Sequence, residues 1–254
     1  MQKVVLNIPH SSTNIPSWAE KDIIISESEL SLLIDFMTDK DIDKLWSFVP
    51  KENKQIATLS RLIVDTERYR NDADEPMSQK GMGLYYTHTP FGNEFRIKSE
   101  DTYYKCLSAY DEYHSSLEKK VTQCLAKHQN CIILDCHSFH DEMNYTGFHP
   151  SSFPDVCIGV NDVVGDEAQF VIDIFKSAGY NVKINEPFAG SLVPIKYLND
   201  ARVQSIMIEL NRRIYDNVSF DSVQDICKKI YKELTKELCE KTNKGREIHG
   251  KIIR

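Results

Sequence analysis

The sequence predicts a single three-layer α/β/α domain built on a mixed, largely parallel central sheet. Short apolar runs rich in β-branched residues, at 4–8, 131–134 and 203–211, alternate along the chain with longer stretches of helical apolar spacing. The 254 residues are 41% hydrophobic, which is enough for one well-buried core, and no Pro/Gly/Ser-rich linker divides them. We therefore expect one domain over residues 1–254, ending in a basic tail at 241–254.

Composition and charge narrow the classes of function. The formal net charge is -7, the isoelectric point is near 5.6, and Lys and Arg cluster only in the short tail. A nucleic-acid surface needs clustered basic residues, so we expect no nucleic-acid partner. The N-terminus enters an apolar run without a signal-peptide pattern, and no apolar run has the length of a membrane span. These features predict a cytoplasmic protein with no membrane partner.

The cysteines also favour a cytoplasmic protein. Seven are present, an odd number, and they are scattered without CxxC spacing. This pattern is typical of reduced core residues rather than of a disulfide framework or a thiolate metal site.

The strongest signal for a site is a pair of histidines, each placed near the end of a predicted strand. The apolar run 131–134 leads into Asp135 and His137, and the run 4–8 leads into His10. In open α/β sheets the carboxyl ends of the strands border the crevice where ligands bind, so one shared site is expected. Neutral imidazoles are ligands of zinc, usually together with a carboxylate and an open position for water. The alternative for each histidine alone is a hydrogen-bonding loop residue.

Two helix starts are expected before residue 50. Ser26 and Glu29 precede an apolar helical pattern with the spacing of a capping box. Asp39 precedes a second helical pattern over residues 42–48, which puts it at or near a helix N-terminus. Asp39 is then either a capping residue or a carboxylate of the site.

Residues 56–64 are predicted to form a strand that ends in Asp65, Glu67 and Arg68. A guanidinium can clamp a substrate carboxylate through two parallel hydrogen bonds, which a lysine does less well. Arg68 is therefore a candidate substrate-binding residue. The alternative is a surface salt bridge with a neighbouring acid.

The rest of the chain alternates loops, helices and strands. Residues 71–96 are rich in Gly, Pro, Asp and Tyr, which predicts a long loop of the kind that often covers a site. Helical spacing returns over residues 99–128. The later expected elements are strands at 156–160, 182–185 and 203–211 and helices at 167–178 and 220–240.

Glu209 interrupts the buried run of the strand at 203–211. A carboxylate in such a position is costly unless it is paired or used. Glu209 is therefore a candidate general base with a raised pKa. The alternative is a salt bridge to Arg212 or Arg213.

Taken together, these segments resemble the N-formylglutamate amidohydrolase family, a group of zinc-dependent hydrolases related in fold to the zinc carboxypeptidases. No single matching piece is specific, but the set follows the family's order over most of the chain. The resemblance implies a phosphorylase/hydrolase-like fold, Zn2+ as the cofactor and a role in amino-acid catabolism. The pieces are Ile8-Pro9-His10-Ser11-Ser12, Thr38-Asp39, Val64-Asp65 with Arg68, Thr87 and Thr89, Tyr113-His114, Asp135-Cys136-His137-Ser138, Asn185 with Pro187-Phe188, and Glu209 with Arg212.

The resemblance also implies roles for the metal-binding residues. His10 and His137 become nitrogen ligands of the zinc. In zinc carboxypeptidases, an Asp-x-Asn-Arg run similar to residues 65–68 has its Asp behind the first histidine ligand and its Arg on the substrate. By position, Asp65 then orients His10 from behind. Asp39 is left as the third ligand, with Asp65 and Glu67 as the alternatives.

The same resemblance implies a reaction. Glu209 becomes the catalytic base, and Thr89, Asn185 and Arg212 join Arg68 as substrate-binding residues. The enzyme is expected to hydrolyse a linear amide and to release an N-acyl group from an amino acid with a carboxylate, such as N-formylglutamate. The alternatives are a murein or short-peptide amidase with the same metal site, and a non-catalytic homologue that binds a metal or ligand.

Three positions depart from the family pattern. Glu67 and His88 stand where the family commonly has Asn and Arg, and Gly190-Ser191 stands where it has Gly-Gly. A negative charge at Glu67 beside Arg68 would partly neutralise a pocket for a carboxylate. These departures affect the expected substrate more than the expected reaction, because neither the expected metal ligands nor Glu209 are among them.

Overall fold

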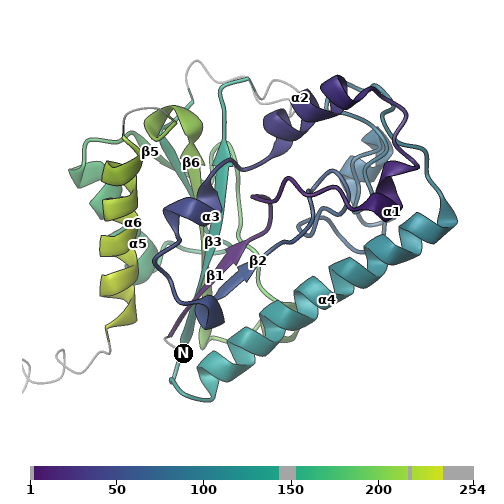
Figure 1. Cartoon of the computed structure of the whole chain (residues 1–254). Helices are drawn as coiled ribbons and strands as arrows, with labels where there is room; N and C mark the ends of the chain where they lie inside the picture. Colours follow the sequence, from purple (N-terminus) through teal and green to yellow (C-terminus); the bar gives the residue numbers. More distant parts are fainter. Residues whose placement is uncertain (1–2, 143–152, 217–218, 237–254) are drawn as a thin grey trace, which may run out of the picture.

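A six-stranded sheet forms the centre of the structure, a computed structural model that describes residues 3–142, 153–216 and 219–236 (Figure 1). The strand order is β2-β1-β3-β6-β4-β5. The strands are β1 (Val4–Ile8), β2 (Lys54–Ile56), β3 (Cys131–Phe139), β4 (Val156–Gly159), β5 (Val182–Ile184) and β6 (Val203–Asn211). All neighbouring strands pair in parallel except β4 and β6, which are antiparallel. The sheet is therefore mixed and mostly parallel, as predicted.

Helices cover both faces of the sheet. α3 (Ile42–Leu45), α5 (Asp166–Ser177) and α6 (Phe220–Thr235) contribute to the apolar cluster on one face. The long helix α4 (Glu100–Leu125) packs on the other face, where its apolar side chains meet those of β1 and β3. Figure 1 shows the three layers, with α5 and α6 on one side of the sheet and α4 on the other. The predicted three-layer architecture is confirmed.

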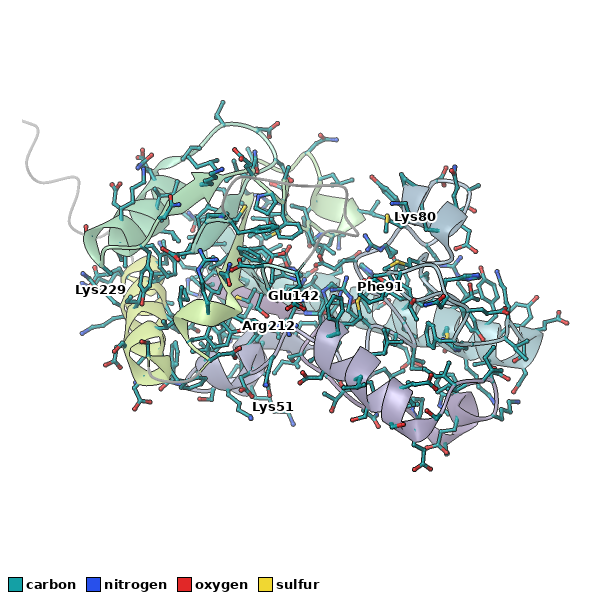
Figure 2. All side chains as sticks on the ribbon, turned by 90° about the horizontal axis from the view of Figure 1, so that it is seen from above. Lys51, Lys80, Phe91, Glu142, Arg212 and Lys229 are labelled. Atoms are coloured by element: carbon teal, nitrogen blue, oxygen red, sulfur yellow. The ribbon has the colours of Figure 1, made fainter. Side chains whose placement is uncertain are left out.

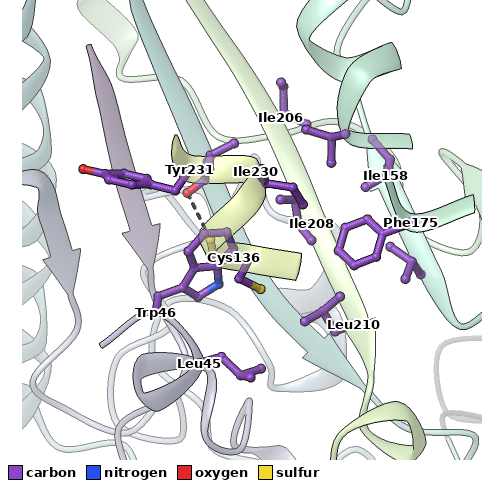
Figure 3. Close-up of a cluster of buried hydrophobic side chains, with 14 of the residues drawn as sticks. Leu45, Trp46, Cys136, Ile158, Phe175, Ile206, Ile208, Leu210, Ile230 and Tyr231 are labelled. Atoms are coloured by element: carbon purple, nitrogen blue, oxygen red, sulfur yellow. Dashed lines mark hydrogen bonds between the residues drawn. The ribbon is translucent and has the colours of Figure 1, made fainter. Parts of the chain in front are cut away.

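The larger apolar cluster fixes the orientation of the central strands. Ile206, Ile208 and Leu210 of β6 belong to it, together with Phe175 of α5 and Ile230 of α6 (Figure 3). Successive side chains of a strand point to opposite faces, so the residues between them point toward α4. Burial of the apolar face thus determines which side chains of β6 face α4.

α1 (Ser17–Glu20) and part of residues 57–97 pack against the first half of α4, and α2 (Glu27–Met37) packs against other residues of 57–97 (Figure 1). The predicted capping box at the start of α2 is confirmed. Ser26 Oγ accepts a hydrogen bond from the N–H of Glu29, and the Glu29 carboxylate accepts one from the N–H of Ser26. Short 3-10 helices complete the described elements: η1 (Lys51–Asn53), η2 (Pro76–Lys80), η4 (Ile195–Tyr197) and η5 (Arg212–Ile214).

The strand predicted at residues 56–64 is wrong. β2 ends at Ile56, and the chain then turns, with the N–H groups of Ile63 and Val64 both bonded to the carbonyl of Ser60. The side chain of Arg96, fully buried, donates to the carbonyl of Ile63 at 3.1 Å. A side chain therefore satisfies backbone groups that a strand would pair in a sheet, and the sequence pattern cannot show this.

The six cysteines among the described residues are buried, and none of them forms a disulfide, as expected. In the same part of the chain, no helix has the length and apolar character needed to cross a membrane. The expected end of the last helix at residues 237–240 and the basic tail at 241–254 lie outside the described residues.

Candidate metal centre

His10 lies just past the end of β1, where Pro9 cannot donate a ladder hydrogen bond. The carbonyl of His10 accepts a hydrogen bond from the N–H of Asp39 at 2.9 Å, which ties this loop to the segment between α2 and α3. Both side chains are buried. Asp41 rather than Asp39 occupies the N-cap position of α3. The alternative interpretation of Asp39 as a capping residue is therefore wrong.

β3 carries the second histidine on the face that α4 covers. The strand continues to Phe139, so His137 lies within it rather than after its end. The Cα of His137 pairs with that of Glu209 on β6, and the Cα of Asp135 pairs with that of Asn7 on β1. Because alternate residues share a face, these four side chains gather at one place on the sheet.

Each histidine has a carboxylate behind one ring nitrogen. Asp65 Oδ1 lies 2.8 Å from Nε2 of His10, and Asp135 Oδ1 lies 3.1 Å from Nε2 of His137. In a neutral ring, such a contact places the proton on Nε2 and leaves Nδ1 as the free lone pair. Asp39 Oδ2 lies 3.0 Å from Nδ1 of His137 and 3.7 Å from Nδ1 of His10.

These atoms fit a metal ion. Bonds of roughly 2.0–2.2 Å in a tetrahedral zinc site put neighbouring ligand atoms about 3.3–3.6 Å apart. The two distances from Asp39, 3.0 and 3.7 Å, lie on either side of that range. Nδ1 of His10 is buried and has no hydrogen-bond partner among the described residues. A buried nitrogen of this kind is satisfied when it ligates an ion.

Glu67 offers a second way to complete the ligand set. Its Oε2 lies 3.3 Å from Nε2 of His137, and ligand atoms of His10, Glu67 and His137 all lie within 4.8 Å of one another. Nδ2 of Asn7 donates to Glu67 at 3.1 Å and to Asp135 at 2.8 Å. Glu67 approaches the His137 nitrogen that Asp135 also contacts, whereas Asp39 faces the other nitrogen. Both carboxylates are candidates for the third ligand.

The shifts in pKa around His137 indicate an excess of negative charge. Burial alone would lower the pKa of His137, but the carboxylates of Glu67 and Asp135 raise it well above its usual value. Burial and the charge of Asp135 both raise the pKa of Glu67. Carboxylates held close together in a buried space raise one another's pKa and the pKa of a nearby histidine. A bound cation would stabilise the ionised carboxylates.

Arg61, which no sequence pattern singles out, joins two carboxylates of the site. Its Nη2 donates to Asp65 Oδ2 at 2.9 Å, and its Nη1 lies 3.8 Å from Asp39 Oδ1. The hydroxyl of Tyr86 donates to the same Asp65 oxygen at 2.6 Å. Burial alone would raise the pKa of Asp65, but Arg61 and His10 hold it well below its usual range. Asp65 is therefore ionised behind His10.

Glu209 is buried on β6 beside His137. Burial raises its pKa to about 8, and its Oε2 has no hydrogen-bond partner among the described residues. The salt-bridge alternative is not observed there, because Arg212 donates to backbone carbonyls and Arg213 contacts Asp155. A buried carboxylate with an available oxygen has the properties of a general base.

The residues predicted to bind substrate have different surroundings. Arg68 lines a cavity of about 850 Å³ together with Glu67 and Asp135, the two acids that contact Nε2 of His137. The side-chain oxygens of Thr89 and Asn185 instead accept hydrogen bonds from nearby backbone N–H groups, which shapes the local chain. Contacts of these residues with a substrate stay predictions.

Arg212 lies beside the end of α2 (Figure 2). Its guanidinium donates to the carbonyls of Asp35, Phe36 and Thr38. The last carbonyls of a helix have no partner within the helix, so these bonds stabilise its end. Because Thr38 leads directly into Asp39, Arg212 positions the segment that carries this carboxylate. A direct contact between Arg212 and a substrate stays a prediction.

A mostly parallel sheet that gathers two histidines and several carboxylates on one face defines an α/β protein with a site able to hold a metal ion. The chain belongs to the N-formylglutamate amidohydrolase family, whose model matches residues 2–216. The family resemblance of the sequence is thereby confirmed. A search of the curated proteins finds no match.

Two solved structures have a similar fold. The N-formylglutamate amidohydrolase from Ralstonia eutropha JMP134 matches with a TM-score of 0.79 and 19% sequence identity, over 92% of this chain and 93% of that chain. The gene product Atu2144 from Agrobacterium tumefaciens matches with a TM-score of 0.64 and 17% identity, over 92% of this chain and 90% of that chain. Both matches extend over nearly the whole chain and agree with the α/β fold class.

Arg212→Met is expected to lower the free energy of unfolding by about 1–3 kcal/mol, because the carbonyls at the end of α2 lose a charged donor. Urea denaturation measures the change. Arg202→Met is the matched control, since Arg202 is exposed and pairs with Asp200 at the surface, and this variant should be nearly as stable as the wild type. Unchanged stability of Arg212→Met would contradict the positioning role.

Proposed function

We propose that the protein is a zinc-dependent amidohydrolase that releases the acyl group, most simply formyl, from an N-acylated amino acid. One observation carries the proposal: the Nδ1 atoms of His10 and His137 converge on one oxygen of Asp39, beside the buried carboxylate of Glu209. Membership in an amidohydrolase family supports the reaction class. Two imidazoles and a carboxylate are a ligand set that suits zinc.

His10, Asp39 and His137 would hold the ion, and zinc there would supply a Lewis acid that polarises the scissile carbonyl and acidifies water. Asp65 and Asp135 each accept a hydrogen bond from Nε2 of one histidine, which fixes the ring and turns Nδ1 toward Asp39. Both histidines are therefore pre-oriented by groups that do not themselves need to touch the substrate.

Glu209 is the proton carrier in this proposal. It takes the proton of the attacking water and passes it to the leaving nitrogen of the amide. Its Oε2 accepts no hydrogen bond from the described residues, so no protein donor there competes for that oxygen. Its pairing with His137 across β3 and β6 keeps it beside the proposed ligands.

Arg68 is the anchor for the substrate carboxylate. Its Nη2 donates to the hydroxyl of Tyr86 at 3.3 Å, and its Nε lies 3.5 Å from Asp65 Oδ2. These contacts hold the guanidinium plane at the wall of the cavity and, among the described residues, leave Nη1 for a ligand. A carboxylate held there sets the distance between the scissile amide and the metal centre.

Glu209→Gln is expected to keep zinc but to lose kcat by a factor of at least about 100, because an amide cannot accept the proton of water. Steady-state kinetics with N-formyl amino acids and metal analysis of the same preparation measure the two quantities. Glu233→Gln is the control: Glu233 lies on α6, on the other side of the sheet, and pairs with Lys236, so this variant should keep full activity. Near wild-type turnover in Glu209→Gln would remove Glu209 from the mechanism.

Asp39→Ala is expected to bind zinc more weakly than either Asp65→Ala or Glu67→Ala. Loss of a residue behind a ligand typically weakens metal affinity by roughly 10- to 100-fold, and loss of a direct ligand should weaken it at least as much. Competition with a chelating dye gives the affinity of each purified variant, and melting temperatures show whether each is folded. Wild-type affinity in Asp39→Ala, with zinc lost from Glu67→Ala or Asp65→Ala, would move the third ligand to that residue.

A further inference from the structure

The cavity of about 850 Å³ lies on the α4 face of the sheet, on the Nε2 side of His137. Glu67 and Asp135, which line it, both contact Nε2 of His137. Tyr110 of α4 and the segment 189–195 provide further lining residues. Pockets for small ligands typically measure roughly 300–1,000 Å³, so this cavity has room for a bulky substrate.

One wall of the cavity is apolar. Ile195 and Leu198 are large aliphatic residues, yet they are 87% and 60% exposed. They line the cavity together with Leu192, Val193, Pro194 and Met207. An apolar surface gathered at a cavity is a site of contact with an apolar part of a ligand, because that contact removes it from water.

The charged residues of the cavity offer a cation to one substrate carboxylate but not to a second. Among the described residues that line the cavity, the cations are Arg68 and Arg70. The guanidinium of Arg70 already pairs with Asp111: its Nε and Nη2 donate to the two carboxylate oxygens at 2.7 and 2.8 Å. A second substrate carboxylate would find no further cation among the described residues of this lining, so it would gain no charge-assisted hydrogen bond from a cation there. It would also meet the acids of the lining, which are Glu67, Glu75, Asp111, Glu118 and Asp135.

We propose that this cavity selects N-acylated amino acids with a single carboxylate and a bulky apolar side chain, and that it discriminates against dicarboxylic amino acids such as glutamate. Arg68 would bind the carboxylate, and the apolar residues between Leu192 and Leu198 would contact the side chain. The inference rests on the proposed function for the reaction, whereas the preferred side chain of the substrate is inferred from the residues that line the cavity.

The zinc-loaded enzyme should hydrolyse N-formyl-phenylalanine and N-formyl-leucine with a kcat/KM at least about tenfold higher than that for N-formylglutamate. The three substrates are compared at one pH and one zinc concentration. A kcat/KM for N-formylglutamate equal to or above the values for the apolar substrates would overturn the proposal.

Ile195→Arg adds a cation to the apolar wall at a position exposed enough to accept it. The ratio of kcat/KM for N-formyl-phenylalanine to that for N-formylglutamate should fall by about two- to fivefold. Val163→Arg is the matched control, because Val163 is also apolar, is 85% exposed and is not among the lining residues, so its ratio should stay unchanged. No change in Ile195→Arg, or the same change in both variants, would contradict the assignment of the wall.

Binding separates this inference from the proposed reaction. Calorimetric titration of zinc-loaded Glu209→Gln should give a Kd for N-formyl-phenylalanine at least about tenfold lower than that for N-formylglutamate. This result, combined with no hydrolysis of any formylated amino acid by the wild type, would keep the cavity assignment and reject the proposed function. Equal or tighter binding of N-formylglutamate, or no measurable binding of either compound, would overturn the cavity assignment.

Discussion

Two buried histidines set among buried carboxylates are the constraint on which the rest of the site depends. Asp39, Asp65 and Asp135 are each at most 3% exposed, and each lies beside a ring nitrogen of His10 or His137. An ionised carboxylate in such a place is unfavourable unless it is paired or hydrogen-bonded. Asn7 donates to Asp135, and Tyr86 and the nearby Arg61 donate to Asp65. A cation between the Nδ1 atoms and Asp39 would balance the remaining negative charge.

The sheet holds this polar cluster in place by burying its opposite face. Cys136 and Ile208 belong to the large apolar cluster (Figure 3), while the next residues along the two strands, His137 and Glu209, point toward α4. A slip of one residue in either strand would exchange the two faces and would bury the polar groups in the apolar cluster. The geometry of the site and the packing of the core are therefore fixed together.

The sequence predicted correctly those elements that depend on the pattern of neighbouring residues. β1 and β6 have the predicted limits, the capping box of α2 is present, and His10 and His137 meet because strand ends meet in a parallel sheet. Local signals failed where distant side chains decide the conformation. Residues 56–64 have the composition of a strand, but the buried side chain of Arg96 binds a carbonyl of this segment.

The same limit applies to the surroundings of the histidines. An Asp just before a helical pattern suggests a cap, whereas the carboxylate of Asp39 faces both imidazoles. Arg61 pairs with Asp65 locally, four residues along the chain. Its approach to Asp39, and that of Glu67 to His137, join segments that are far apart in the sequence. Residue types and order predicted the two histidines and a choice of carboxylates, while the choice of nitrogen on each ring required the three-dimensional contacts.

Zinc titration of the melting temperature tests most directly whether His10, Asp39 and His137 hold a cation. Metal-free protein, prepared with a chelator, should melt at a temperature that rises with free zinc. A ligand bound only by the folded state adds about 2.7 kcal/mol to the free energy of unfolding at one hundred times its Kd. His10→Asn should abolish this rise, because it removes a proposed nitrogen ligand. A wild-type melting temperature that is independent of zinc, or an equal rise in His10→Asn, would contradict the assignment of this cluster as a metal centre.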